Sequence, residues 1–193
     1  MTELDQAVKA RECLASKIFD ELRDGTHDGL GITRPSYGEG EQFAHALIGE
    51  HAQSLGLQVE CDSAGNTFMV LPGANREAPA VIVGSHLDSV ARGGNFDGAA
   101  GVIAGLVATA ALQDADVVPE RDVRVMAIRG EEGEWFGVPY IGSRSALGTL
   151  PGYTLDEAKR VDSNITLYEH MIQCGCDPDA IRGGQISLPQ HLS

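Results

Sequence analysis

The sequence predicts an α/β fold, a sandwich of helices around a mostly parallel central sheet. Strand-like and helix-like segments alternate along most of the chain, as they do in βαβ units. The run "APAVIVGS" at residues 78–85 is almost continuously apolar, which is typical of a strand buried on both faces. The stretch "GAAGVIAGLVATAAL" at residues 98–112 is apolar around nearly its whole circumference, which predicts a buried helix.

The helices are predicted from apolar residues that recur at spacings of three and four. They are expected over residues 4–22, 41–55, 98–112, 154–160 and 165–175. The Gly-rich segment between the first two is expected to be a loop, and Gly56 is expected to cap the second helix. Thr154, with Glu157 three residues later, predicts a capping box at the start of the fourth helix.

The strands are predicted from short apolar runs bounded by Gly, Pro, Asn and Ser. They are expected over residues 57–62, 67–73, 78–85 and 122–130. The first two flank "SAGN", a turn in which Gly and Asn accept positive φ at little cost. With 193 residues, 42% of them apolar, the chain is long enough to bury a core of domain size.

Composition excludes several classes of protein. A formal net charge of −14 argues against a nucleic-acid or anionic-membrane partner, because both favour Lys and Arg. No apolar stretch reaches the roughly 18 residues of a membrane span. The amino terminus "MTELDQAVKA" lacks the basic and apolar regions of a secretory signal. The four cysteines have no disulfide-framework spacing, so we expect reduced thiols and a cytoplasmic protein.

Chemistry-bearing side chains follow two of the predicted strands. His86 and Asp88 come directly after the strand 78–85, and the pair Glu131-Glu132 follows the strand 122–130. In α/β sheets the functional crevice lies outside the carboxyl ends of the strands. Asp97, at the start of the buried helix, is expected to reach the same place through the flexible loop before it.

Imidazole and carboxylates form a ligand set suited to Zn²⁺, Mn²⁺ or Co²⁺. Asp97 is the natural bridge between two metals, because its loop lies between the two strand ends and a carboxylate has two oxygens. Asp88 is placed to accept a hydrogen bond from the far ring nitrogen of His86. Because consecutive residues point in different directions, one of Glu131 and Glu132 can bind metal while the other takes a proton from water.

Two segments resemble the M20 metallopeptidase clan, "GSHLDSVARGGNFDGAAGV" and "RGEEGEWFGVPYIGSRSALG". They are most similar to hydantoinase/carbamoylase-type amidases, the group of N-carbamoyl-L-amino-acid hydrolases, β-ureidopropionases and allantoate amidohydrolases. Upstream, "GITRPSYGEGE" and "GLQVECDSAGNTFMVLPG" resemble the same branch, so the resemblance covers roughly residues 29–150. It implies a zinc-exopeptidase-like fold and a hydrolase that cleaves linear carbamoyl or ureido C–N bonds in small molecules.

The resemblance also implies a role for each site residue. His86, Asp97 and Glu132 match the family's ligands for two divalent ions, Zn or Mn, with Co and Ni as alternatives. Glu131 matches the general base, and Asp88 matches the aspartate that supports the histidine. The stretch Gly142, Ser143 and Arg144 matches a loop beside the substrate pocket.

The resemblance further implies that residues 1–193 are the amino-terminal portion of a dinuclear-metal catalytic domain. The carboxy-terminal catalytic part and the lid-like dimerisation domain of the family are absent, and a homodimer is implied for the full-length parent. The histidines that complete the two metals are missing, and only His170 and His191 could replace them. His170 is expected to be a surface or packing residue, and His191 lies close to the chain end.

Three functions are therefore weighed. The first is a metal-dependent amidohydrolase, inactive or nearly so as this chain alone. The second is an aminopeptidase or dipeptidase that shares the metal core. The third is a non-catalytic metal-binding or interaction module, whose mark would be an exposed apolar face.

Overall fold

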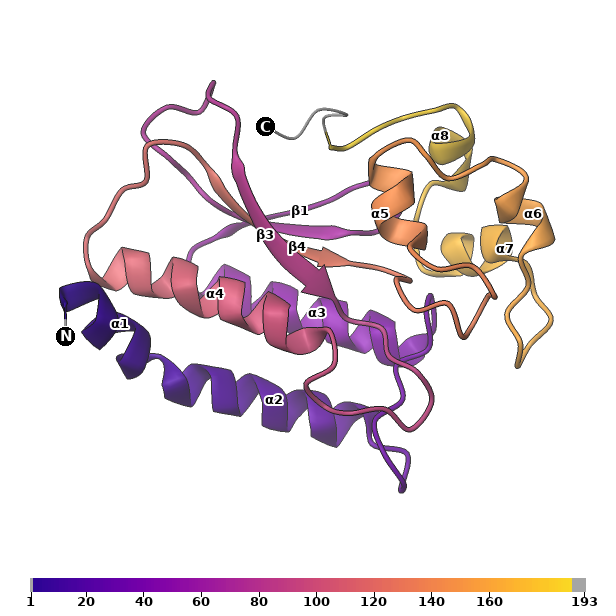
Figure 1. The fold of residues 1–193 in the computed structure, drawn as a ribbon, viewed down its shortest axis with the longest axis horizontal. Coiled ribbons are helices and arrows are strands. Elements are labelled where there is room, and N and C mark those ends of the chain that lie inside the picture. The colour runs from indigo at the N-terminus through magenta and orange to yellow at the C-terminus, as the bar shows by residue number, and fades with distance from the viewer. Residues whose placement is uncertain (1, 189–193) are drawn as a thin grey trace.

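The computed structural model describes residues 2–188 as a twisted four-stranded sheet that is covered by helices (Figure 1). The strands are β1 (Gln58–Cys61), β2 (Thr67–Leu71), β3 (Val81–His86) and β4 (Val123–Ile128). The helices are α1 (Glu3–Ala10), α2 (Glu12–Thr26), α3 (Glu39–Ser54), α4 (Ala99–Asp114), α5 (Ile141–Ala146), α6 (Thr154–Glu157), α7 (Leu167–Gln173) and α8 (Pro178–Arg182). No helix among residues 2–188 combines the length and the apolar character needed to cross a bilayer.

The spatial order of the strands is β1-β2-β4-β3. The predicted α/β class is confirmed, and α4 connects β3 to β4 as the crossover of a parallel βαβ unit. The other two pairings, β1 with β2 and β2 with β4, are antiparallel. The sheet is therefore mixed rather than mostly parallel. The physical reason for the first pairing is the short turn between β1 and β2, which is too short for a parallel crossover.

The expectation that the strand in segment 78–85 is buried on both faces is wrong. β3 is the last strand in the spatial order, so it has a neighbour on one side only among the described residues. Val81 and Val83 are 50% and 42% exposed. The strand that is buried throughout is β2, which lies inside the sheet between β1 and β4.

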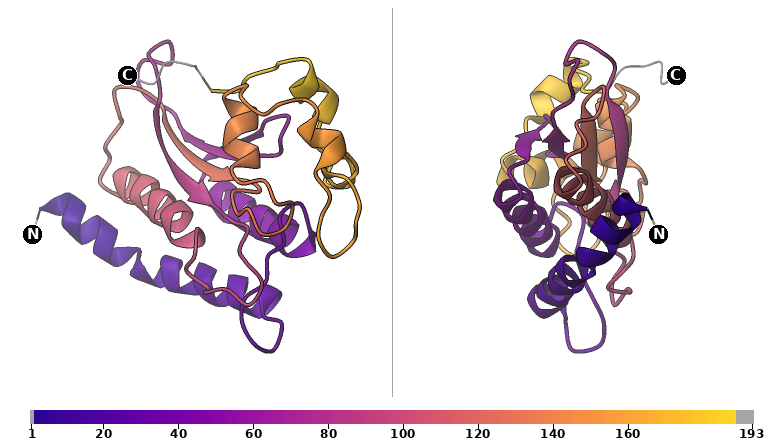
Figure 2. Two further views of the ribbon diagram at one scale, coloured as in Figure 1. Left: turned by 45° about the vertical axis from the view of Figure 1, so that its right-hand side comes forward. Right: turned by 90° about the vertical axis from the view of Figure 1, so that its left-hand side faces the viewer.

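The main core lies between one face of the sheet and the helices α3 and α4, and α1 and α2 pack on these helices from outside (Figure 2). The predicted burial of the helix at 98–112 is confirmed, since eight residues of α4 are buried. On the other face of the sheet, Phe68, Val70 and Met126 pack against Ala146 of α5.

The single helix expected over residues 4–22 is two helices. α1 ends at Ala10 and α2 begins at Glu12, with Arg11 between them. Arg11 donates two hydrogen bonds of 2.6 Å to the carboxylate of Asp114 at the end of α4. The break therefore lets α1 lie against α4 while α2 follows α3.

The helices α5–α8 form a second packed group at one end of the sheet, around Phe136, Leu155 and Leu167. The capping box predicted at Thr154 is wrong, because α6 begins there without a side-chain cap. Its short length leaves Glu157 at the end of the helix. A capping box is instead present at Thr166 and Glu169, where α7 begins.

Candidate metal centre

The parallel pairing of β3 and β4 brings the predicted site residues to one edge of the sheet. His86 is the last residue of β3 and is paired with Ile128, so Glu131 and Glu132 follow within the next turn of chain. The ligand atoms of His86, Asp97 and Glu132 all lie within 4.8 Å of one another. His86 Nε2 is 3.9 Å from a carboxylate oxygen of Asp97 and 3.9 Å from one of Glu132.

Asp97 reaches this position through a tight turn at Gly98. The φ angle of Gly98 is +63°, and a Cβ atom there would lie 2.5 Å from the carbonyl oxygen of His86 and 2.6 Å from its ring. Only glycine fits such an approach without displacing the histidine. The start of α4 is thereby packed directly onto the end of β3.

The ring of His86 has two different environments. Nδ1 lies 3.0 Å from the backbone oxygen of Asp88 and 3.2 Å from its carboxylate, which leaves Nε2 directed at Asp97 and Glu132. Burial lowers the pKa of His86, but the hydrogen bonds and charge of Asp88 and the charge of Glu132 outweigh it and raise the pKa to about 9. The predicted contact between Asp88 and the far ring nitrogen is present.

Asp88 also organises the backbone of the glutamate pair. Its carboxylate accepts the N–H groups of Glu131 at 3.1 Å and Glu132 at 3.0 Å, and the hydroxyl of Ser36 at 2.6 Å. The side chain is completely buried. One carboxylate therefore fixes both strand ends relative to each other.

The two glutamates have separate surroundings. Glu132 faces His86, whereas the carboxylate of Glu131 accepts hydrogen bonds from the N–H and the hydroxyl of Ser143, at 2.9 and 3.0 Å. Burial raises the pKa of Glu131 above its ordinary value, and the bonds from Ser143 oppose that rise. Burial also raises the pKa of Glu132, where Asp97 adds to the effect and His86 opposes it.

The loop matched to a substrate pocket is only partly directed at the site. Ser143 touches Glu131, and Gly142 supports the turn by accepting a hydrogen bond from the side chain of Asn66 at 3.1 Å. The guanidinium of Arg144 donates to the carbonyl oxygen of Thr149 at 3.5 Å. The structure thus brings Ser143 to the site and Arg144 to its own loop.

Sequence reasoning missed two residues that join the loop after β3 to the loop after β4. Glu134 accepts the N–H of Ala91 at 2.8 Å, and the indole N–H of Trp135 donates to the backbone oxygen of Ser89 at 2.7 Å. Their signal was present in "EEGEW", where a third acidic residue and the only tryptophan of the chain follow the glutamate pair.

The donor set fits a divalent cation. One imidazole nitrogen and two carboxylates converge, and the other ring nitrogen is held by Asp88, as is usual for metal-binding histidines. Within residues 2–188 this is the only such group of three. His170 lies in α7, stacked edge-on against Phe136 and 3.0 Å from the hydroxyl of Ser163, so its predicted packing role is confirmed. His191 lies outside the described residues.

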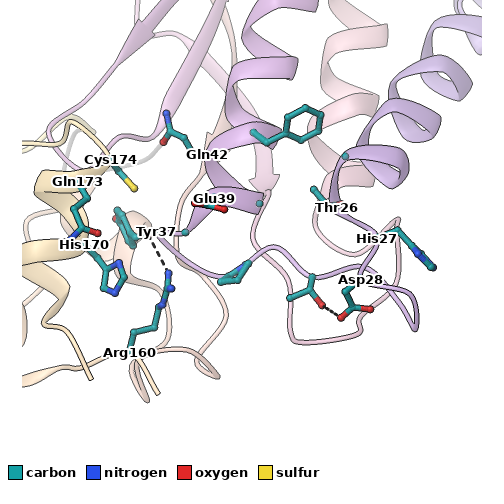
Figure 3. A pocket seen from close by; sticks show the side chains of 16 residues that line it. Thr26, His27, Asp28, Tyr37, Glu39, Gln42, Arg160, His170, Gln173 and Cys174 are labelled. Atoms are coloured by element: carbon teal, nitrogen blue, oxygen red, sulfur yellow. Dashed lines mark hydrogen bonds between the residues drawn. The ribbon is translucent and has the colours of Figure 1, made fainter. Parts of the chain in front are cut away.

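A large open cavity of about 820 Å³ lies elsewhere, between the start of α3 and the helix α7 (Figure 3). Its lining includes Tyr37, Glu39, Arg160 and His170, and none of the three clustered ligands. The cavity and the cluster are therefore separate features of the surface.

Comparisons with known proteins identify the family to which the chain is similar. Residues 66–162, just over half of the chain, match the model of peptidase family M28. An N-carbamoyl-L-amino acid amidohydrolase of Geobacillus stearothermophilus is 41% identical over 170 residues, which are 88% of this chain and 41% of that protein. An allantoate amidohydrolase of Bacillus subtilis is 30% identical over 145 residues, 75% of this chain and 35% of that protein.

Solved structures give the same result. A hydantoinase/carbamoylase family amidase from Burkholderia ambifaria superimposes with a TM-score of 0.74 at 30% identity, over 84% of this chain and 41% of that one. The resemblance to hydantoinase/carbamoylase-type amidases is thereby confirmed. The chain spans 35–41% of the length of these three relatives.

Proposed function

Because the chain belongs to peptidase family M28, we propose that it is the metal-binding portion of a hydrolase that cleaves linear carbamoyl or ureido C–N bonds. The observation that carries this proposal is the convergence of His86, Asp97 and Glu132 within 4.8 Å. The names of the relatives, N-carbamoyl-L-amino acid and allantoate amidohydrolases, support this class of substrate.

We propose that the site takes two divalent ions, Zn²⁺ or Mn²⁺, with Co²⁺ and Ni²⁺ as alternatives. His86 and Glu132 would each hold an ion, and Asp97 would bridge through its two carboxylate oxygens. The side chain of Asp97 is 41% exposed, so an ion can reach its carboxylate from solvent. Bound divalent ions supply a Lewis acid that polarises the substrate carbonyl and promotes the ionisation of water.

In this proposal Glu131 is the proton carrier. Its carboxylate takes a proton from the attacking water as the new C–O bond forms, and returns it to the leaving nitrogen as the C–N bond breaks. The two hydrogen bonds from Ser143 hold this carboxylate, while the burial that raises its pKa favours a group able to accept and return a proton. Asp88 positions His86 and the backbone of both glutamates.

We infer that residues 1–193 correspond to the amino-terminal portion of a longer catalytic domain. The partial coverage of the relatives supports this inference. A homodimer of the longer parent and a cytoplasmic location also belong to the proposal. The location is supported by four free cysteines, two of them exposed, which a reducing compartment tolerates. With three clustered ligands, this chain alone is expected to have little or no turnover.

Metal titration of the 193-residue chain tests the proposal. Zn²⁺ and Mn²⁺ are added against a chromophoric chelator, and Asp97→Ala is compared with Asp20→Ala, which removes an exposed aspartate from α2. Saturable binding that Asp97→Ala weakens and Asp20→Ala leaves intact supports the site. Equal binding by both variants contradicts it.

The preferred substrate distinguishes the amidohydrolase proposal from the aminopeptidase alternative. Hydrolysis of an N-carbamoyl-L-amino acid and of a dipeptide is compared in the longer parent protein, each with Glu131→Gln as the blank. Faster cleavage of the dipeptide would replace the amidohydrolase proposal with the peptidase one.

A further inference from the structure

The segment that precedes α3 is bound closely along the loop that carries the candidate ligands. Ile32 and Gly93 exchange backbone hydrogen bonds of 3.1 and 2.8 Å. The N–H of Ser89 donates to the oxygen of Arg34 at 2.9 Å, and the N–H of Arg34 donates to the hydroxyl of Ser89 at 3.0 Å. A Cβ at Gly31 would lie 2.7 Å from the backbone of Arg92, so the two backbone segments are in direct contact.

Arg34 stands out within this segment because its side chain is fully buried. Among residues 2–188, its guanidinium has no carboxylate as a hydrogen-bond partner. Instead, Nε donates to the backbone oxygen of Leu87 at 2.5 Å and Nη2 donates to the backbone oxygen of Asp97 at 2.9 Å. The guanidinium of Arg34 thus connects the backbone of Leu87, which lies between His86 and Asp88, to the backbone of Asp97.

A fully buried cation is costly unless its charge is paired and its N–H groups are hydrogen-bonded. Nη1 has no hydrogen-bond partner among the described residues, so the cost is not fully offset by bonding. The acidic groups whose charges act on Arg34 are Asp97, Asp88 and Glu41. The charge of Arg34 therefore acts on two of the site's carboxylates, Asp97 and Asp88, while its N–H groups hold the backbone oxygens of Leu87 and Asp97.

We propose that Arg34 is a positioning residue of the metal site, which sets the separation between His86 and Asp97 by bonding the backbone oxygens of Leu87 and Asp97. This inference rests on the proposed metal site. The guanidinium suits the task because its N–H donors are fixed in one plane, whereas a lysine ammonium is a single point on a flexible stem.

The test compares Arg34→Lys and Arg34→Gln with Ile48→Val, a mild change at a fully buried position of α3. Zn²⁺ affinity of the 193-residue chain is measured by chelator competition, at a temperature where circular dichroism shows every variant folded. Loss of such a supporting contact typically weakens metal binding by about 10–100-fold. We expect that loss in both Arg34 variants and none in Ile48→Val, although Ile48→Val also lowers the melting temperature.

A second measurement needs no metal. Amide hydrogen exchange of the metal-free chain is followed at residues 93–100, where Gly93, Asp97 and Ala100 donate backbone hydrogen bonds, and at β2 as an internal reference. We expect faster exchange at residues 93–100 in both Arg34 variants and unchanged exchange at β2. If neither variant folds, Arg34→Met keeps an unbranched apolar stem without the charge or the N–H donors, and the exchange comparison is made there.

Each outcome decides the inference. Wild-type affinity with unchanged local exchange overturns it, and so does a loss shared by Ile48→Val. Normal affinity in Arg34→Lys alone would mean that charge, not the planar fork, matters, and it too overturns the inference. If the wild-type chain binds no ion, the proposed function fails, while the exchange of residues 93–100 still decides whether Arg34 positions the loop.

Discussion

The candidate ligands and the residues beneath them differ in how firmly the fold holds them. The side chains of Asp97 and Glu132 are 41% and 28% exposed, and they share one edge with His86. Three charged side chains that contact the same loops are fully buried, and we call them the buried layer: Arg34, Glu41 and Asp88. Most of the bonds of this buried layer go to backbone groups of the ligand-bearing loops. The difference teaches that the exposed side chains, which we call the exposed layer, are accessible to an ion or a small molecule, whereas the buried side chains hold the backbone that carries them.

Glu41 extends the buried layer under the end of β4. Its carboxylate accepts the N–H groups of Gly130 at 2.8 Å and Tyr37 at 2.6 Å, and it pairs with Arg129 at 3.2 Å. The turn that leads into Glu131 is therefore held from α3. Like Asp88, this residue acts on the site through the backbone.

The largest effect on stability is expected where a buried carboxylate is removed. Asp88→Ala leaves the N–H groups of Glu131 and Glu132 and the hydroxyl of Ser36 without their acceptor. Removing one partner of a buried charged network costs about 3–5 kcal/mol. Urea unfolding of the metal-free chain measures this loss, with Asp88→Asn as the control, which keeps one acceptor oxygen and should lose less. Equal stability of Asp88→Ala and the wild type would remove the distinction between the two layers.

A smaller loss of stability is expected from a substitution at Gly98, in the turn that brings Asp97 next to His86. Gly98→Ala puts a Cβ 2.5 Å from the carbonyl oxygen of His86 in a backbone with φ of +63°. Such backbone strain costs about 1–3 kcal/mol. Thermal unfolding checks the cost, and chelator competition checks the accompanying loss of Zn²⁺ affinity. Gly94→Ala is the matched control, since a Cβ there meets open space, and a comparable loss in both variants would argue against the close approach.

An effect of about 1 kcal/mol is expected from pH at a buried histidine away from the ligands. Nδ1 of His45 lies 2.9 Å from the hydroxyl of Thr67, and Nε2 has no partner within the described chain. Burial, with the charge of Arg129, holds the pKa of His45 well below its ordinary value. Below pH 6.5 the unfolded chain therefore binds a proton at His45 that the folded chain does not bind. The free energy of unfolding contributed by His45 thus falls as the pH drops below 6.5.

Unfolding free energies at pH 7.5 and 5.5 measure this dependence. Lowering the pH one unit below the ordinary histidine pKa costs about 1.4 kcal/mol for such a group. The raised pKa values of His86 and Glu41 make acidification stabilising over the same range, so the contribution of His45 is read from the difference between the wild type and His45→Phe, which lacks the titrating ring. The stability of the variant relative to the wild type should rise by about 1.4 kcal/mol from pH 7.5 to pH 5.5. If the variant keeps the same slope, other groups account for the pH dependence.

The smallest effect on stability is expected at a ligand. Glu132→Gln removes a partly exposed carboxylate from beside three other acids, and surface changes of this kind stay within about 0.5 kcal/mol. Metal affinity, by contrast, should fall sharply because one of three clustered donors is weakened. Urea unfolding and metal titration on the same samples separate the two quantities. A large loss of stability without metal would place Glu132 with the buried layer.

The exposed layer could be predicted from the sequence because its signals are local. His86 and the glutamate pair follow apolar runs whose strand character is plain, and the helix between them predicts a parallel crossover. In the buried layer, Asp88 could be predicted because it follows His86 closely, but the other buried polar residues gave weaker signals. Glu41 and His45 are polar residues on the inward face of a helix, one turn apart, and only packing against Arg129 and Thr67 distinguishes them from surface residues.

The errors in the fold prediction have a common physical origin. The exposure of β3 and the antiparallel pairing of β2 with β4 depend on which strands become neighbours, and that choice is made by contacts distant in the sequence. The break at Arg11 coincides with its hydrogen bonds to Asp114, a residue 103 positions away. Periodicity within one segment carries no information about such partners.

The single tryptophan has a consequence for observing this molecule. Trp135 is the only indole in the chain, it is 93% buried, and its N–H bonds the carbonyl oxygen of Ser89 across the two ligand-bearing loops. The wavelength of its fluorescence emission therefore reports on the contact between those loops, because separation would expose the ring to water and shift the emission maximum to longer wavelength. Trp135 is therefore an intrinsic fluorescence probe of the candidate site, and it needs neither a label nor a substrate.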